Sequence, residues 1–470
     1  MNEAKTEVFR NAPVPKAVLS NALPAMLAML MVLVYNLADT FFIGQTGDAL
    51  QVAAVSLATP VFLIFMTLGT VFGIGGTSLI SRCLGAGRAE YARHICAFCF
   101  WGCLVTGAVL LVIMFAFMDP LLYAIGASNE TFDFAKTYLA IISACGPLAV
   151  LGNCFSNILR AEGQSARGMA GMTIGNIVNF VLDPVLILGA GWGVAGCALA
   201  TVIGNAIGAG YYLLYFLRGR SSLSIRLPDV RLSDGIFGGV MAIGIPAAIG
   251  DLMMSVSNIV VNAQMAAYGD MAVAGIGVAM KVTMMTGIMC IGLAQGVQPL
   301  LGYCTGAQME DRYRKCLHFS LAFSLGLSTV LTLLCYAFTG PIVGAFLENP
   351  DAYSYAVEFS RILLSTSFLF GVFYVLLNAL QAMGASTASL IVNLSRQGLI
   401  YLPALFILQS VLGVTGLVWA QPVADVLSLA LEVVLYRRAF RKLWGGKKNA
   451  ADRKMGRAHS TAAASRRLSR

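Results

Sequence analysis

The stretch ALPAMLAMLMVLVYN, residues 22–36, decides the fold because it recurs in altered form as GIPAAIGDLMMSVSN at residues 244–258. Each copy is part of an apolar run long enough to cross a bilayer. Further matches keep almost the same spacing: LRAEGQS (159–165) pairs with LQAMGAS (380–386), and GVAGCALA (193–200) pairs with GVTGLVWA (413–420). The offset stays between 220 and 222 residues, so the chain is two copies of one unit.

The composition places both copies in a membrane. Of the 470 residues, 58% are hydrophobic and only 11% are charged, whereas a soluble domain carries about 25% charged residues. Apolar stretches of spanning length recur twelve times, and we expect helices because a segment in the bilayer must satisfy its own backbone hydrogen bonds. The twelve spans are expected near 17–43, 50–80, 94–118, 132–160, 167–190, 192–217, 235–265, 273–302, 316–343, 354–383, 387–409 and 414–438.

Each copy contains six spans, so both copies start on the same side of the membrane and form parallel repeats about an axis along the membrane normal. We therefore predict an all-α membrane protein of two six-helix bundles. The small-residue pairs Gly171/Gly175 and Gly204/Gly208 predict close helix contacts within the first bundle. The expected segments are an N-terminal cytoplasmic segment (1–16), an N-lobe (17–218), a cytoplasmic linker (219–234), a C-lobe (235–438) and a basic, disordered cytoplasmic tail (439–470).

The connections differ in their content of Lys and Arg, which predicts orientation. The N-terminal segment and the second, sixth and eighth connections are basic, whereas the connections around 44–49, 119–131, 266–272 and 344–353 contain no Lys or Arg. Both termini of this multi-pass protein are therefore expected in the cytoplasm. The net charge of +9 comes largely from the tail and the loops and does not indicate nucleic-acid binding.

Two acids lie within spans of the first copy, Asp39 in the first and Asp183 in the fifth. A charged side chain at the bilayer centre costs at least ~2.5–3.5 kcal/mol, so it faces a cavity or a partner. At the local offset Asp39 falls on Val261, and Asp183 falls on Leu402 or Pro403, so the second copy lacks both acids. We expect an ion site in one lobe only. The alternative is that hydrogen bonds neutralise both acids and that they merely hold helices together.

Polar groups accompany these acids on the same helix faces. Tyr35 lies four residues before the first acid, and Asn179 lies four residues before the second. Pro184 removes a backbone donor and loosens the helix at that depth, and Thr201 adds a hydroxyl from the sixth span. These hard oxygen ligands suit Na⁺, and they equally suit a proton on a buried carboxyl group because burial disfavours the charged form.

The charges of the second copy allow two interpretations. Asp251 with Lys281, and Arg396 with Asp425, can form structural ion pairs between neighbouring spans, which we expect, or they can contact substrate. The methionines of the eighth span form an adaptable stripe that either packs in the core or lines a drug cavity. The candidates for the lining of a substrate cavity are Asp251, Met284 and Met285.

These features together resemble the multidrug and toxic compound extrusion (MATE) family of cation antiporters, and within it the Gram-positive multidrug-export subgroup. The resemblance covers about residues 10–440. It rests on Pro24, Tyr35, DTFFIG (39–44), GAGR (85–88), LRAEG (159–163), Asn179 with Asp183-Pro184, and GVAGCALAT (193–201).

The resemblance implies two six-helix lobes in a V and alternating-access export of bulky lipophilic organic cations in exchange for inward H⁺ or Na⁺. It implies a location in the bacterial inner (cytoplasmic) membrane. We expect no cofactor, and a monomer with organic cation drugs and the lipid bilayer as its partners. By position, the family's N-lobe cation site matches Asp39, Asn179, Asp183 and Thr201, which would hold Na⁺ in a sodium-coupled protein. Tyr35 matches a residue of its hydrogen-bond network, and Pro24 matches a residue associated with bending of the first helix; Pro184 is a second candidate for bending.

Three expectations limit this interpretation. Some relatives carry a C-lobe glutamate eight residues after the proline of the seventh span, but Met254 stands at that place here, which puts a C-lobe ion site of that type in doubt. A flippase for lipid-linked sugars is the alternative function, with Lys281 and Arg396 as its basic groups. We expect no enzyme and no catalytic residues, because no His-Glu-x-x-His motif and no Ser/His pair lies within a span.

Overall fold

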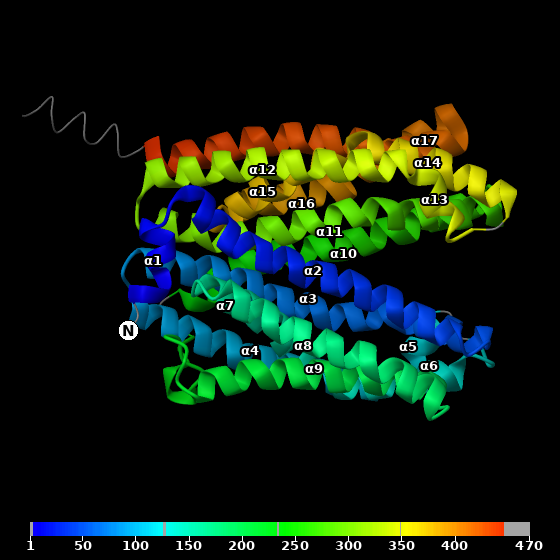
Figure 1. Cartoon of the computed structure of the whole chain (residues 1–470), viewed down its shortest axis with the longest axis horizontal. Coiled ribbons are helices and arrows are strands. Elements are labelled where there is room, and N and C mark those ends of the chain that lie inside the picture. The colour runs from blue at the N-terminus through cyan, green and yellow to red at the C-terminus, as the bar shows by residue number, and fades with distance from the viewer. Residues whose placement is uncertain (1–2, 126–127, 233–234, 348, 446–470) are drawn as a thin grey trace, which may run out of the picture.

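The computed structural model is helical throughout, and no strand occurs among the residues that it describes. Figure 1 shows long helices running side by side in two groups, with the first half of the chain in one group and the second half in the other. The predicted all-helical class is thereby confirmed. The structure describes residues 3–125, 128–232, 235–347 and 349–445.

The first half begins with a short helix and continues through long ones. We call α2 to α9 the N-lobe. The elements are α1 (Glu3–Asn11), α2 (Val14–Gly44), α3 (Ala49–Gly85), α4 (Ala89–Ala116), α5 (Met118–Ala124), α6 (Phe132–Ala144), α7 (Gly146–Ala161), α8 (Ser165–Asp183), the π-helix η1 (Pro184–Gly189) and α9 (Gly193–Leu217).

A connection with one short 3₁₀ helix, η2 (Leu227–Asp229), leads to the second half. We call α10 to α17 the C-lobe. Its elements are α10 (Ile236–Ala266), α11 (Asp270–Gly306), α12 (Glu310–Ala337), α13 (Thr339–Gly344), α14 (Pro350–Ser367), α15 (Phe370–Met383), α16 (Ser386–Leu394), the π-helix η3 (Ser395–Leu399), α17 (Tyr401–Phe440) and the π-helix η4 (Arg441–Gly445).

These helices accommodate the twelve expected spans. Among the described residues, nine helical runs are long and apolar enough to cross a membrane, and two bent pairs, α6 with α7 and α14 with α15, bring the number to 11. The run from Ser386 to Gly445 has 60 residues, about twice the length that a bilayer requires. Gly413 breaks it with a non-helical backbone, so this run contains the last two spans.

The two lobes touch most closely through glycines near one end of the molecule. A Cβ added to Gly75 or Gly244 would overlap a carbonyl group of the opposite lobe, and a Cβ at Gly306 would overlap the Arg82 carbonyl. These positions lie in the last half of α3 and α11 and in the first half of α10. The helices diverge toward the other end, as Figure 1 shows.

Both described ends of the chain lie at the side where the lobes meet (Figure 1). There α1 is held against the C-lobe, because Phe9 is fully buried and Arg312 donates hydrogen bonds to the carbonyls of Val8, Phe9 and Ala12. A cation at the last carbonyls of a helix is favourable. At the other terminus, helical structure continues past residue 438 to Gly445, farther than expected; the rest of the predicted tail lies outside the described residues.

Candidate functional site

Three helices bring the predicted polar residues of the N-lobe together. α2 carries Tyr35 and Asp39 and continues as one helix through Pro24. α8 buries a stripe of residues at intervals of three or four that ends with Asn179 and Asp183. The third helix, α9, contributes its own buried face, which contains Thr201.

The geometry of this group is close and acidic. One carboxylate oxygen of Asp39, one of Asp183 and the thiol of Cys197 lie within 4.8 Å of one another. The Asn179 side-chain nitrogen donates a hydrogen bond of 3.2 Å to the Thr201 hydroxyl. Asp183 is fully buried, and Asn179 and Thr201 are 2% and 3% exposed. We call these five residues, with Tyr35, the N-lobe acid site.

Several oxygens of the N-lobe acid site have no hydrogen-bond partner among the described residues. They are one oxygen of Asp39, the amide oxygen of Asn179 and both carboxylate oxygens of Asp183. No described Lys, Arg or His side chain forms an ion pair with either acid. A buried acid without a basic partner must bind a proton or a cation, because an isolated buried charge is costly. The oxygen donors fit Na⁺ or H⁺ equally well.

The helix geometry changes at this site. Pro184 follows Asp183 directly, and the backbone from Pro184 to Gly189 winds as a π-helix. Proline removes a backbone donor, and single turns of π-helix occur frequently at functional sites. The loosened turn therefore lies where the sequence predicted it, immediately beyond the buried acid.

A cavity of about 380 Å³ adjoins the N-lobe acid site. Tyr35, Asp39, Asn179 and Thr201 form part of its wall, whereas Asp183 is fully buried. Most of the remaining wall is apolar or aromatic and includes Val32, Ile43, Phe62, Leu63, Met66, Tyr138 and Tyr212. Such a lining, with a few convergent polar groups, is typical of a small-molecule pocket.

Sequence reasoning missed two members of this region. The Cys197 thiol lies within 4.8 Å of a carboxylate oxygen of each acid, although a cysteine in an apolar run is ordinarily a packing residue. Its signal was its position four residues before Thr201, on the same face of α9. Tyr138 comes from α6 and is 6% exposed; nothing in its local sequence indicated that α6 approaches the acids.

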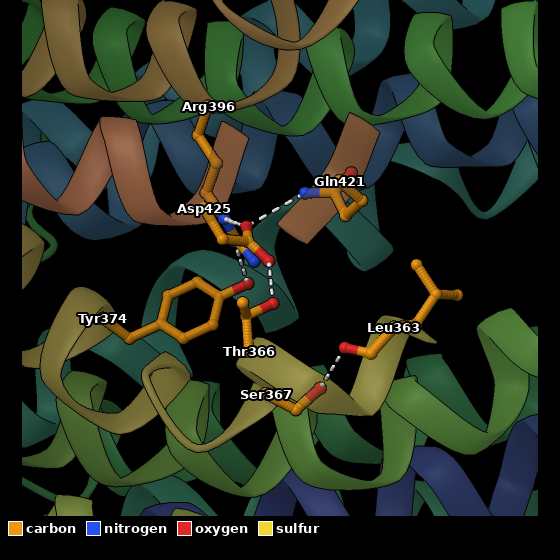
Figure 2. Close-up of polar contacts among 7 residues, drawn as sticks. All are labelled: Leu363, Thr366, Ser367, Tyr374, Arg396, Gln421 and Asp425. Atoms are coloured by element: carbon orange, nitrogen blue, oxygen red, sulfur yellow. Dashed lines mark hydrogen bonds and ion pairs between the residues drawn. The ribbon is translucent and has the colours of Figure 1, made fainter. Parts of the chain in front are cut away.

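The charges of the C-lobe behave differently. Arg396 Nε donates to Asp425 at 2.9 Å in a buried ion pair, as expected from the sequence. Arg396 Nη1 donates to the Tyr374 hydroxyl at 2.8 Å. Thr366 and Gln421 donate to the Asp425 carboxylate at 3.2 and 3.0 Å, so each of its oxygens has a partner. Figure 2 shows Arg396, Thr366 and Gln421 converging on the carboxylate, with the Tyr374 hydroxyl beside the guanidinium.

The second expected ion pair is wrong. Lys281 is exposed and lies over the Phe346 ring, 5.5 Å from its centroid, and the structure contains no contact of ion-pair length between it and Asp251. Asp251 instead faces Thr70 of the N-lobe. Spacing along two antiparallel helices does not determine how each is rotated about its axis, which is why the pairing failed.

The methionines of the eighth span lie in different environments. Met284 is 46% exposed, whereas Met285 packs against the buried cluster around Val278 and Val282. Met280 and Met289 pack against two other apolar clusters. Of the three residues predicted to line a substrate cavity, Asp251 and Met284 are exposed and Met285 is part of the core.

The fold and the buried polar groups define a polytopic membrane transporter built from two repeated halves. Comparison with protein-family models identifies the family of this transporter. The MatE model matches residues 24–185 and again residues 246–407. The chain belongs to the MatE family of transporters, and it is therefore not an enzyme. The family resemblance seen in the sequence is confirmed.

Relatives with assigned roles match along nearly the whole chain. The multidrug export protein MepA of Staphylococcus aureus (strain MSSA476) is 29% identical over 441 residues, which are 93% of this chain and 96% of the relative. MepA of Staphylococcus haemolyticus (strain JCSC1435) is 29% identical over 439 residues, with the same coverage.

Solved structures show the same fold. An outward-facing multidrug resistance MATE family transporter of the MOP superfamily superposes with a TM-score of 0.87 at 23% identity, covering 94% of this chain and 98% of that one. The Vibrio cholerae MATE transporter VcmN in the bent form gives a TM-score of 0.84 at 22% identity, covering 92% and 98%.

Proposed function

We propose that this protein exports bulky lipophilic organic cations in exchange for inward H⁺ or Na⁺ by alternating access. One observation carries the proposal: two acids share the N-lobe acid site without a basic partner among the described residues. The relatives named multidrug export proteins support the substrate class. The cavity beside the acids also supports it, because its volume of about 380 Å³ lies in the range of small-molecule pockets.

The coupling follows from charge. Asp39 lines the cavity, so its carboxylate can attract an organic cation while the apolar and aromatic wall covers the rest of the molecule. A coupling ion that binds between Asp39 and Asp183 removes this attraction, because it neutralises the same carboxylates. Drug and coupling ion therefore compete for one charge, and export results if the ion enters from outside and the drug from inside.

The membrane orientation belongs to the same proposal. We place both termini in the cytoplasm of a bacterial cell, because the connections on their side are the basic ones. In this orientation the lobes meet on the cytoplasmic side, and the structure is an outward-facing state. Alternating access then requires the glycine contacts near Gly75, Gly244 and Gly306 to separate when the protein opens inward.

A flippase for lipid-linked sugars is less well supported. Such a protein needs free basic groups for a pyrophosphate. Arg396 is already bound to Asp425 and Tyr374, and Lys281 lies over Phe346. We therefore favour cation export.

Two experiments test the proposal. Purified protein in liposomes is given an inward Na⁺ gradient or an inward pH gradient, one at a time, and ethidium movement is measured; the proposal fails if neither drives transport. In cells, Asp183→Asn is expected to abolish ethidium efflux. Asp119→Asn is the matched control, because Asp119 is exposed and bound to Lys136. Efflux by Asp183→Asn equal to wild type would remove this acid from the mechanism.

A further inference from the structure

Glu432 is a second buried acid without a partner, and it lies far from the N-lobe acid site. It belongs to α17 and is fully buried. Both of its carboxylate oxygens lack a hydrogen-bond partner among the described residues. It lies seven residues after Asp425, about 10 Å farther along the helix toward the terminal side of the molecule.

The face of α17 that carries Glu432 is polar over two turns. Asp425, Ser428 and Glu432 are all buried there, with the Ser428 hydroxyl also unpartnered. The helix α17 packs on α14, α15, α16 and η3. Two polar atoms of α15 and α16 are also buried without partners among the described residues, the Asn378 amide oxygen and the Ser389 hydroxyl. Unpartnered buried polar atoms thus occur on α17 and on helices that pack against it.

Charge balance indicates the protonation state of Glu432. The nearby cation, Arg396, is already bound, because its Nε donates to Asp425 and its Nη1 donates to Tyr374. One guanidinium balances one carboxylate. The second carboxyl group must then be neutral, because a buried carboxylate without a partner is costly.

An outlet lies close to Glu432. Tyr436 is one helical turn beyond it on α17 and lines a cavity of about 310 Å³ on the terminal side. Arg437, Arg441 and Glu310 also line this cavity. Water in such a polar cavity can accept a proton one turn from the carboxyl group.

We propose that Glu432 is a proton-binding site of the C-lobe, separate from the ion pair between Arg396 and Asp425. The proton leaves when the O–H bond of Glu432 breaks and water in the cavity beside Tyr436 accepts it, and it returns to the carboxylate by the same route. Such a site differs from the doubtful one near Met254, because it lies on the twelfth span.

Infrared spectroscopy of the purified protein at neutral pH tests the protonation without any transport assay, so its outcome is independent of the proposed export. Glu432→Gln resembles the neutral acid in shape and is expected to fold like wild type, with the loss of one C=O band of a protonated carboxyl group. Ser428→Ala is the control and should retain the band. An unchanged spectrum in Glu432→Gln would mean that Glu432 is ionised, which overturns the proposal.

A second variant tests the assignment of the band. Asp183→Asn removes an acid of the other lobe and should leave the band assigned to Glu432 in place. If Asp183→Asn and Glu432→Gln lose the same band, the band does not belong to Glu432 and the proposal fails.

Discussion

The two lobes bury acids in opposite ways. In the N-lobe, Asp39 and Asp183 face each other across less than 4.8 Å and have no basic partner among the described residues. In the C-lobe, Asp425 is bound by Arg396 and by two neutral donors. The difference shows that burial alone does not define a functional acid: a permanent counter-charge makes the acid part of the scaffold, and its absence leaves room for an exchangeable ion.

The internal repeat makes this comparison sharper. At an offset of 220 residues, Arg396 and Asp425 correspond to Asn176 and Asn205 of the N-lobe, and both asparagines line the cavity beside the acids. Each lobe thus has charges where the other has neutral residues. One scaffold was used twice, once around a fixed ion pair and once around a pair of acids that need a visiting cation.

The largest expected effect comes from breaking the fixed pair. Arg396→Met should lower the free energy of unfolding by about 3–5 kcal/mol, because it leaves a buried carboxylate uncompensated. Adding Asp425→Leu should restore most of the loss, since a well-packed apolar pair can replace a buried ion pair. Thermal unfolding of the detergent-purified protein measures both. A double variant as unstable as the single one would contradict the counter-charge argument.

The two acids of the N-lobe, Asp39 and Asp183, should instead make the stability of the protein depend on the ion that binds them. Na⁺ or protons that bind the folded protein stabilise it by about 2.7 kcal/mol at one hundred times the dissociation constant. We expect the melting temperature of wild type to rise with one of these ions, and that of Asp183→Asn to stay constant. Titrations of Na⁺ at constant ionic strength, and of pH, check this. Asp119→Asn should behave like wild type; an equal rise in Asp183→Asn would place the ion elsewhere.

Much of this architecture could be predicted from the sequence because it depends on local patterns. Apolar run length predicts the spans, and the repeat predicts two equal halves. Asp39 and Asp183 could be grouped with Tyr35 and Asn179 because residues four apart share a helix face. The glycines predicted close helix contacts, and a Cβ at Gly175 would lie 2.7 Å from the Gly204 carbonyl oxygen.

What could not be predicted depends on how distant helices are rotated and which of them cover one another. Tyr138 reaches the acid site from α6, whose approach no local pattern reveals, whereas Cys197 could have been found from Thr201, four residues later on the same face of α9. Glu432 lies near the end of the last span, where a charged side chain ordinarily extends to the membrane surface. It is nevertheless fully buried, because α17 packs against other helices of the C-lobe, which a single helix sequence does not show.

A smaller change in stability is expected from the close glycine contact between α8 and α9. Gly175→Ala places a Cβ against the Gly204 backbone and should separate α8 from α9, lowering stability by about 1–3 kcal/mol. Because the same two helices carry Asn179 and Thr201, ion-dependent stabilisation should weaken as well. Gly210→Ala in α9 is the control, since no neighbouring group lies within 4 Å of a Cβ at that position. Thermal unfolding with and without the coupling ion distinguishes the two variants, and equal behaviour would exclude the contact as a determinant.

The smallest expected effect comes from removing one hydroxyl group in each lobe and comparing how strongly the coupling ion then binds. Thr201→Val removes the acceptor of the Asn179 hydrogen bond and should cost about 1 kcal/mol, which weakens binding of the coupling ion about fivefold. Thr366→Val removes a donor to Asp425, but Arg396 still holds that carboxylate, so ion binding should not change. Ion titrations of melting temperature compare the two variants directly. If Thr366→Val weakened ion binding as much as Thr201→Val, the coupling ion would depend on both lobes, and the division between a fixed and an exchangeable charge would be wrong.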